Sequence, residues 1–249
     1  MSNVSISTNK LSIGYDASVV QRDLTFSLYR GEMVCMLGPN GCGKSTLLRT
    51  LAGLQPALNG AYNLASLDPQ PASLKSKSIA LVLTERLSLE NTTVHDVVAM
   101  GRYPYTSFLG GLTEKDEQII EESLRQVGFG DLSVGRTFFN AHSDGEKQRI
   151  LIAKALAQQT PIILLDEPTA HLDLPHRILV LRLLRNLAHE QGKTILISTH
   201  ELDLALALSD RILLMSPHAR GVQLDTAENL KKADAFTSAF GMDIFDPLG

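Results

Sequence analysis

The string Gly-Pro-Asn-Gly-Cys-Gly-Lys-Ser at residues 38–45 limits the possible folds more than any other feature of the sequence. It fits the pattern of a glycine, four residues and then Gly-Lys-Ser, in which glycines let the backbone wrap closely around phosphate groups. An apolar run of buried-strand length, residues 33–37, precedes the string, and residues 46–52 follow it as a helix that Gly53 ends. This order of strand, loop and helix favours a phosphate site over an ordinary glycine turn.

The groups in this loop suit a nucleoside triphosphate. We predict that the loop amides and the positive end of the helix hold the phosphates, that Lys44 reaches the outer ones, and that the Ser45 hydroxyl ligates Mg²⁺. The predicted nucleotide-binding residues are Gly38, Pro39, Asn40, Gly41, Cys42, Gly43, Lys44, Ser45 and Thr46.

The composition is that of an ordinary globular protein. Of 249 residues, 44% are hydrophobic and 20% are charged, which fits one large α/β domain or a domain with an inserted subdomain. A formal net charge of -4 gives no general attraction for nucleic acid. Two cysteines, Cys35 and Cys42, suggest neither a disulfide nor a metal site. We expect a cytoplasmic protein, because the sequence has no apolar run near the roughly 20 residues of a membrane span and no signal-peptide pattern at its start.

The N-terminal stretch predicts an antiparallel layer. Residues 4–15 and 24–28 both alternate between apolar and polar side chains, as half-exposed strands do. Tyr15 stands just after the first of these strands. Its ring could stack on a flat base, although an ordinary core or surface tyrosine is the alternative.

A mostly helical insertion is predicted over residues 84–158. Before it, residues 56–77 read as loops with at most a short strand around Tyr62, and residues 79–83 as a strand. Thr93 and Thr113 each stand three residues before an aspartate, which is a helix-start pattern. Apolar residues then keep helical spacing until Gly128.

The C-terminal half alternates strands and helices, which implies a parallel sheet. Strands are predicted at 162–167, 194–198 and 212–215, with helices at about 175–191 and after His200. The composition of residues 221–249 predicts no element.

Polar side chains end two of these apolar strands. Asp166 and Glu167 stand at the carboxyl edge of one strand, where open α/β sheets bind ligands. Asp166 fits a magnesium partner, and Glu167 fits a base that polarises the attacking water. His200 follows another strand, so we expect it to donate to the γ-phosphate or the water, the alternative being a structural histidine.

The string from Ser143 to Arg149 opens an amphipathic run. Ser143 and Glu146 form a capping box, and a helix N-terminus of this kind also binds anions. The residues alone leave both interpretations open.

The order of these motifs resembles the ATPase subunit of an ATP-binding cassette (ABC) transporter, over nearly the whole chain. The resemblance implies that Tyr15 stacks on adenine, that residues 38–46 bind the phosphates of ATP, and that Glu167 is the catalytic glutamate. It also implies that Asp173, after Leu172, is the D-loop aspartate and that His200 is the switch histidine. The residues that carry the resemblance are Tyr15, the 38–45 loop, Ser143-Asp144-Gly145-Glu146, Leu165-Asp166-Glu167-Pro168, Leu172-Asp173 and His200.

The resemblance further implies a dimer that sandwiches two ATP molecules. The family's signature motif corresponds to Ser143, Asp144, Gly145 and Glu146, which would face the γ-phosphate of ATP on the second copy. The signature departs from the usual family pattern at His142, which replaces a leucine, and at Asp144, which replaces a glycine.

The expected fold is therefore α/β: a P-loop NTPase with a parallel sheet core, an antiparallel β layer and a mostly helical inserted subdomain. Within one ABC ATPase domain, residues 1–83 and 159–220 are predicted to form the nucleotide-binding core. Residues 84–158 form the insertion that carries the signature, and 221–249 a C-terminal tail.

Gly101-Arg102-Tyr103-Pro104-Tyr105 resembles importers of iron siderophores, haem and cobalamin. Its alternative interpretation is a helix ended by Pro104. The importer resemblance implies membrane permease subunits as partners and, indirectly, a substrate-binding protein, with no nucleic acid. In place of the family's Q-loop glutamine stand Thr84 and Glu85, one of which we expect to reach the metal through water. The rival class is an assembly ATPase of the same fold, such as that of iron-sulfur cluster assembly.

Overall fold

The computed structural model describes residues 3–16, 18–64, 76–83, 89–106, 111–217, 221–242 and 244–245. Its strands are β1 (Val4–Tyr15), β2 (Ser18–Tyr29), β3 (Met33–Leu37), β4 (Asn59–Leu64), β5 (Ile79–Val82), β6 (Ile162–Asp166), β7 (Thr194–Ser198), β8 (Arg211–Met215) and β9 (Val222–Asp225). Its helices are α1 (Lys44–Leu51), α3 (Val94–Ala99), α4 (Glu114–Gln126), α5 (Asp144–Ala157), α6 (Leu174–Gln191), α7 (Leu202–Leu208), α8 (Ala227–Lys232) and α9 (Ala235–Phe240), with 3-10 helices η1 (Met100–Tyr105), η2 (Leu132–Arg136) and η3 (Phe139–Ala141).

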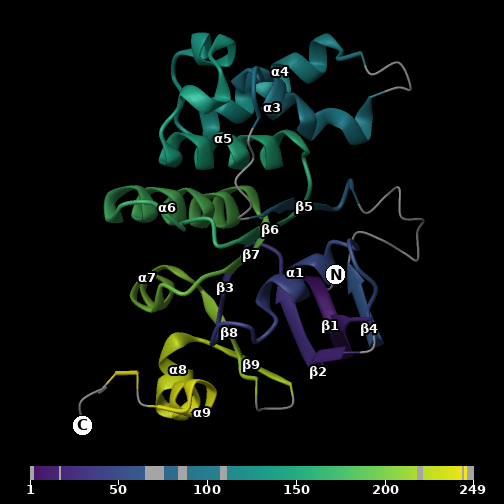
Figure 1. Cartoon of the computed structure of the whole chain (residues 1–249), viewed down its shortest axis with the longest axis vertical. Coiled ribbons are helices and arrows are strands. Elements are labelled where there is room, and N and C mark those ends of the chain that lie inside the picture. The colour runs from purple at the N-terminus through teal and green to yellow at the C-terminus, as the bar shows by residue number, and fades with distance from the viewer. Residues whose placement is uncertain are drawn as a thin grey trace.

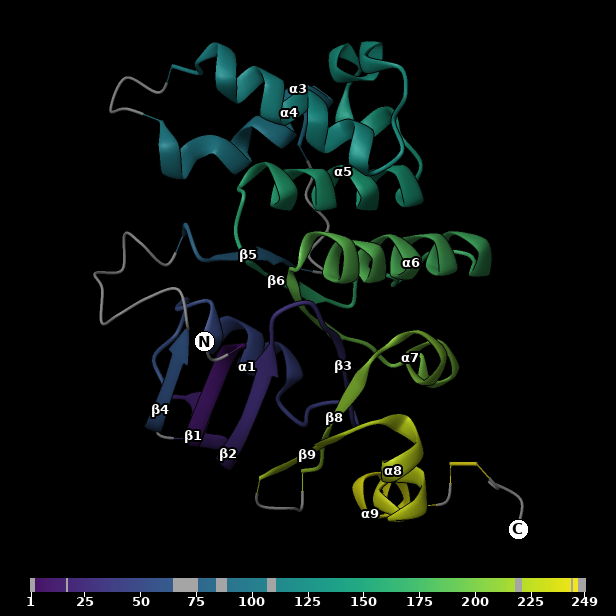
Figure 2. The same ribbon diagram turned by 180° about the vertical axis from the view of Figure 1, so that it is seen from behind.

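The strands form two sheets, which lie on either side of α1 (Figures 1 and 2). The smaller sheet, in the order β2-β1-β4, is antiparallel, as predicted for the N-terminal layer. The larger has the order β5-β6-β7-β3-β8-β9 and is parallel except for the pair β8 and β9. Because β6, β7 and β3 are neighbours, the loops that leave their carboxyl ends meet at one edge.

Both faces of the larger sheet are covered along its central strands. Side chains alternate along each strand, so one strand contributes residues to two separate cores. In β3, Cys35 and Leu37 belong to the core shared with α5 and α6, whereas Val34 and Met36 belong to the core shared with α1 and the smaller sheet. All residues of β3, β6 and β7 are buried. The apolar runs in the sequence at β3, β6 and β7 therefore correspond to central strands that are buried on both faces.

The middle of the chain is helical where it is described, as predicted. Helices α3 and α4 begin after Thr93 and Thr113, and each threonine forms a capping box with the aspartate three residues later. These helices and α5 lie together beyond α6 in Figure 1. In the described part of the chain, no helix combines the length and apolar character of a membrane span. The division of the chain at residues 84 and 159 stays a prediction.

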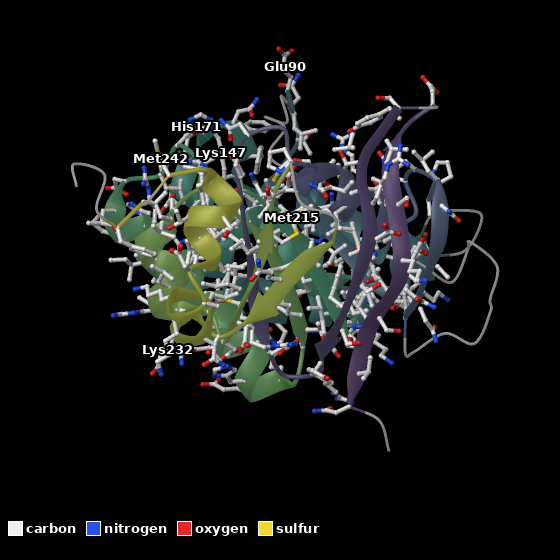
Figure 3. All side chains as sticks on the ribbon, turned by 90° about the horizontal axis from the view of Figure 1, so that it is seen from below. Glu90, Lys147, His171, Met215, Lys232 and Met242 are labelled. Carbon is white, nitrogen blue, oxygen red and sulfur yellow. The ribbon has the colours of Figure 1, made fainter. Side chains whose placement is uncertain are left out.

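Residues 221–249 contain more structure than their composition predicts. Strand β9 pairs with β8 and so extends the larger sheet beyond the predicted core boundary at residue 220. Leu230 and Phe236, from α8 and α9, are buried in the core. Seen along the long axis, these helices lie on the opposite side of the molecule from β1 and β2 (Figure 3). Each of the three elements has six residues or fewer, too few to display a period in the sequence.

Candidate functional site

The phosphate loop leads directly into α1. This helix begins at Lys44, two residues before the predicted start at Thr46, so Lys44 and Ser45 belong to its first turn. Glycine is required at Gly38, where a Cβ atom would lie 2.2 Å from the carbonyl oxygen of Met215, labelled in Figure 3. Gly43 caps the helix with a φ of 100°, a conformation that side chains disfavour. The loop is thus packed tightly against the end of β8.

The Lys44 ammonium group lies over its own loop. Its Nζ atom donates to the carbonyl oxygens of Gly38 at 2.8 Å and Pro39 at 3.2 Å, and the side chain is buried. Cys42 is also buried, and burial raises the pKa of its thiol. The loop therefore presents one positive side chain beside several backbone amides.

Gln21, on β2, contacts the phosphate loop through hydrogen bonds. It is not among the site residues that the sequence predicted. Its Nε2 atom donates to the carbonyl oxygens of Cys42 at 3.0 Å and Ser216 at 2.7 Å. The side chain is buried. A buried amide that bridges two backbone carbonyls connects the antiparallel sheet, the phosphate loop and the end of β8.

Asp166, at the end of β6, lies within hydrogen-bond distance of two hydroxyl groups. Its Oδ1 atom accepts from Ser45 Oγ at 3.0 Å and from Ser198 Oγ at 2.5 Å. Oxygen atoms from α1 and β6 thus converge at the carboxyl edge of the sheet, which is the donor type that hard cations prefer. Ser198 was not predicted; its only sequence signal is a hydroxyl at the end of an apolar strand.

Glu167 is fixed by its backbone. It has a φ of 46°, rare for a residue with a side chain, and its N–H lies 3.0 Å from both the carbonyl and the hydroxyl oxygen of Ser198. Its Oε1 atom lies 3.5 Å from His200 Nδ1. The sequence-predicted catalytic pair is therefore brought together, and both side chains are partly exposed.

Tyr15, at the end of β1, lies beside the phosphate-loop helix. Its hydroxyl oxygen accepts a hydrogen bond from Thr46 Oγ1 at 3.1 Å. The residue is 53% exposed, so its ring remains accessible to a ligand. This placement is compatible with stacking on a base next to the loop.

The signature residues begin α5. Ser143 accepts a hydrogen bond from the Glu146 N–H and donates its hydroxyl to Glu146 Oε2 at 2.8 Å. The hydroxyl and the backbone N–H of Ser143 both donate to this carboxylate, and these two bonds lower the pKa of the Glu146 carboxyl. His142, in the usual leucine position, packs edge-on against Phe129 with ring centroids 6.4 Å apart. Capping is therefore observed, and binding of an anion at Ser143, Asp144, Gly145 and Glu146 stays a prediction.

The predicted signature residues lie beside the predicted D-loop aspartate of the same chain. Asp173 caps α6 by accepting from the His176 N–H, and its carboxylate is hydrogen-bonded to the His176 ring. A Cβ atom on Gly145 would lie 2.9 Å from Cδ2 of that ring. The N-termini of α5 and α6 therefore form one surface. Thr84 and Glu85, the predicted Q-loop residues, lie outside the described residues.

Arg102, from the string at residues 101–105, has an architectural position. It donates to Asp116 Oδ1 at 2.8 Å, to the Ala157 carbonyl oxygen at 2.7 Å and to Gln159 Oε1 at 3.1 Å. Both charged side chains are buried. Hydrogen bonds from Thr113 and Arg102 hold the pKa of Asp116 at about 2. This string therefore joins η1 to α4 and to the end of α5.

The arrangement at the sheet edge can bind phosphates and position water, and comparison with known proteins gives the family. The family profile described as "ABC transporter" matches residues 21–170. An uncharacterized ABC transporter ATP-binding protein of Methanocaldococcus jannaschii is 40% identical over 95% of this chain and 81% of its own length. The chain belongs to the ABC transporter family. As a member of that family, it is an ATPase.

Other ABC relatives are importer subunits. The iron(3+)-hydroxamate import ATP-binding protein of Bacillus subtilis is 36% identical over 96% of this chain and 88% of its own length. The petrobactin import ATP-binding protein of Bacillus anthracis is 34% identical over 93% of this chain and 86% of its own length.

Solved structures agree with this membership of the ABC family. An inward-facing transporter described as of metal-chelate type has a TM-score of 0.84 and 30% identity, covering 96% of this chain and 90% of that one. The fold is therefore that of an ABC ATPase cassette, as predicted.

Proposed function

We propose that this chain is the ATP-hydrolysing subunit of an ABC importer that energises uptake of an iron chelate, haem or cobalamin through a separate membrane permease. The proposal is carried by the 36% identity, over 96% of the chain, to the iron(3+)-hydroxamate import ATP-binding protein. The name of the petrobactin import protein and the metal-chelate type of the solved transporter support the same class.

Hydrolysis is proposed to take place where the loops after β3, β6 and β7 meet. Lys44 and the loop amides bind the ATP phosphates. Mg²⁺ suits the Ser45 hydroxyl and the Asp166 carboxylate, hard oxygen donors that lie 3.0 Å apart, and when bound it would neutralise charge on the phosphate oxygens. Glu167 polarises the attacking water, and His200 donates to the γ-phosphate or to that water.

A second copy of the chain is proposed to complete each ATP site. The signature residues and Asp173 lie on the shared surface at the N-termini of α5 and α6, and we propose that this surface faces the ATP bound to the partner. The positive ends of two helices on one surface favour an anion there.

The remaining partners follow from the proposed import. Permease subunits would hold the ATPase at the inner face of the cell membrane and contact the helical insertion. A substrate-binding protein would act indirectly, through the permease. Thr84 or Glu85 would report the nucleotide state to that contact.

Co-purification tests the proposal against an assembly ATPase. The tagged chain is purified from its native host, its co-purifying proteins are identified by mass spectrometry, and any permease recovered is reconstituted with the chain in proteoliposomes. We expect the permease to co-purify and to stimulate ATP hydrolysis, with Glu167→Gln as the inactive control. Recovery of soluble scaffold proteins alone, with no effect of the permease, would favour iron-sulfur cluster assembly or a similar role.

A further inference from the structure

The first turn of α6 holds an arginine that the proposed chemistry does not use. Arg177 Nε donates to the Leu172 carbonyl oxygen at 2.6 Å, and its Nη1 atom lies 3.4 Å from Glu201 Oε1. Leu172 ends the segment that begins with Glu167, and Glu201 directly follows His200. Arg177 therefore connects the two segments that carry the proposed catalytic pair.

The Glu201 carboxylate depends on this arginine. Its side chain is only 9% exposed, and in the described part of the chain its Oε1 atom accepts no hydrogen bond, so the ion pair with Arg177 is its electrostatic compensation. A buried carboxylate without a counter-charge is unfavourable. The backbone nearby is held by the Glu201 N–H, which donates to Thr199 Oγ1 at 3.1 Å. Loss of Arg177 would therefore act on the segment that carries His200.

Backbone hydrogen bonds join the residues of the segment from Glu167 to Leu172. The Ala170 N–H donates to the Glu167 carbonyl oxygen at 3.0 Å, and the Leu172 N–H donates to that of Thr169 at 3.2 Å. His171 has a φ of 65°, so the backbone turns back on itself. A compact turn of this kind has little slack between the two ends.

We infer that Arg177 is a positioning residue for ATP hydrolysis. By holding Leu172 and Glu201 together, it sets the approach of Glu167 to His200, whose Oε1 and Nδ1 atoms lie 3.5 Å apart. The inference rests on the proposed roles of Glu167 and His200. It does not depend on which substrate is transported.

Single-turnover ATP hydrolysis by the full chain tests the inference. Arg177→Gln removes the ion-pair partner of the Glu201 carboxylate. We expect hydrolysis to slow by roughly tenfold or more, toward the hundredfold that a small misplacement of catalytic groups can cost. ATP affinity should stay within about twofold, because the loss concerns the reaction step. The double variant Arg177→Gln/Glu201→Gln should recover much of the rate, because the lone charge is gone.

The controls separate this role from general damage and from failure of the proposed function. Arg182→Gln, on the exposed face of α6, should leave the rate unchanged. A wild-type rate in Arg177→Gln overturns the inference, as does a joint loss of rate, ATP affinity and melting temperature that the double variant does not relieve. If Glu167→Gln keeps the rate, the proposed role of Glu167 fails and the inference fails with it. If Glu167→Gln loses the rate and Arg177→Gln does not, the inference alone fails.

Discussion

Two strings in this chain combine glycine with a basic residue, and the structure uses them in opposite ways. In the phosphate loop, Lys44 donates to the carbonyl oxygens of Gly38 and Pro39, which belong to its own loop, at an edge where three strands end. In the string at 101–105, Arg102 donates to Asp116, Ala157 and Gln159, which lie on other segments. The first cation has local partners that a phosphate can replace. The second cation, Arg102, uses its hydrogen bonds to join segments of the helical insertion.

The comparison teaches that the partners of a cation, more than the letters around it, indicate what a motif does. Gly38 and Gly101 are both forced by close contacts, since a Cβ atom on either would lie 2.2 Å from a backbone carbonyl oxygen. Their surroundings differ, because one string borders an open sheet edge and the other lies between helices. The string at 101–105 therefore has an architectural role within the chain.

The largest expected effect is the loss of stability in Arg102→Ala. It leaves Asp116 buried without its ion pair, which should lower the free energy of unfolding by about 3 kcal/mol. Chemical denaturation measures this change, and ATP affinity of the folded fraction should be unchanged. Arg125→Ala, which removes an exposed pair with Glu121, is the control and should cost under about 1 kcal/mol. Weakened ATP binding in Arg102→Ala would break the distinction between the two strings.

The next effect is on chemistry at the loop edge. Glu167→Gln keeps the size of the side chain and removes its basicity, so turnover should fall by roughly a hundredfold while the melting temperature stays constant. Quenched assays with labelled ATP measure the turnover, thermal denaturation measures the melting temperature, and sizing in the presence of ATP tests whether the variant forms the proposed dimer. Glu228→Gln, at an exposed position of α8, serves as the control. Near-normal turnover would contradict the proposed role of Glu167 as the base in hydrolysis.

Tyr15→Ala should weaken ATP binding by about 2 kcal/mol, within the range of base stacking on an aromatic ring. Tyr15→Phe loses only the hydrogen bond from Thr46 and should cost less than about 1 kcal/mol. Isothermal titration with ATP compares the two. Equal losses would show that the hydroxyl, and so the loop contact, is the important group.

Gln21→Leu should weaken ATP binding less than Tyr15→Ala does, and it tests how far the antiparallel sheet supports the phosphate loop. Loss of the hydrogen bond from the Gln21 side-chain amide to the Cys42 carbonyl oxygen should weaken ATP binding by about tenfold, or ~1.4 kcal/mol. Titration with ATP measures it. Thr8→Val is the matched control, because Thr8 is a buried polar residue of the same sheet that bonds Phe26 instead. If Gln21→Leu and Thr8→Val lose ATP affinity to the same extent, the antiparallel sheet as a whole supports the loop, and the hydrogen bond from Gln21 has no specific role in ATP binding.

The sequence predicted those parts of the fold that local patterns encode. Strand β3, the caps at Thr93 and Thr113, and the carboxylates that end β6 all lie where spacing and residue type placed them. Short elements were harder, since α8 and α9 have six residues each.

The supporting residues of the site were not predictable because their partners are remote. Gln21 bonds to Ser216, 195 residues away, and Arg177 pairs with Glu201 across a strand. Ser198 hydrogen-bonds Asp166, 32 residues away. No spacing rule connects such pairs, so only the sheet order β6-β7-β3-β8 shows which side chains meet.

The buried Cys42 thiol has a consequence for the chemical durability of the protein. Oxidants and alkylating reagents attack the thiolate, and both burial and the raised pKa keep this sulfur in its protonated form. The Cys42 thiol in the phosphate loop should therefore react more slowly with oxidants and alkylating reagents than an exposed cysteine does.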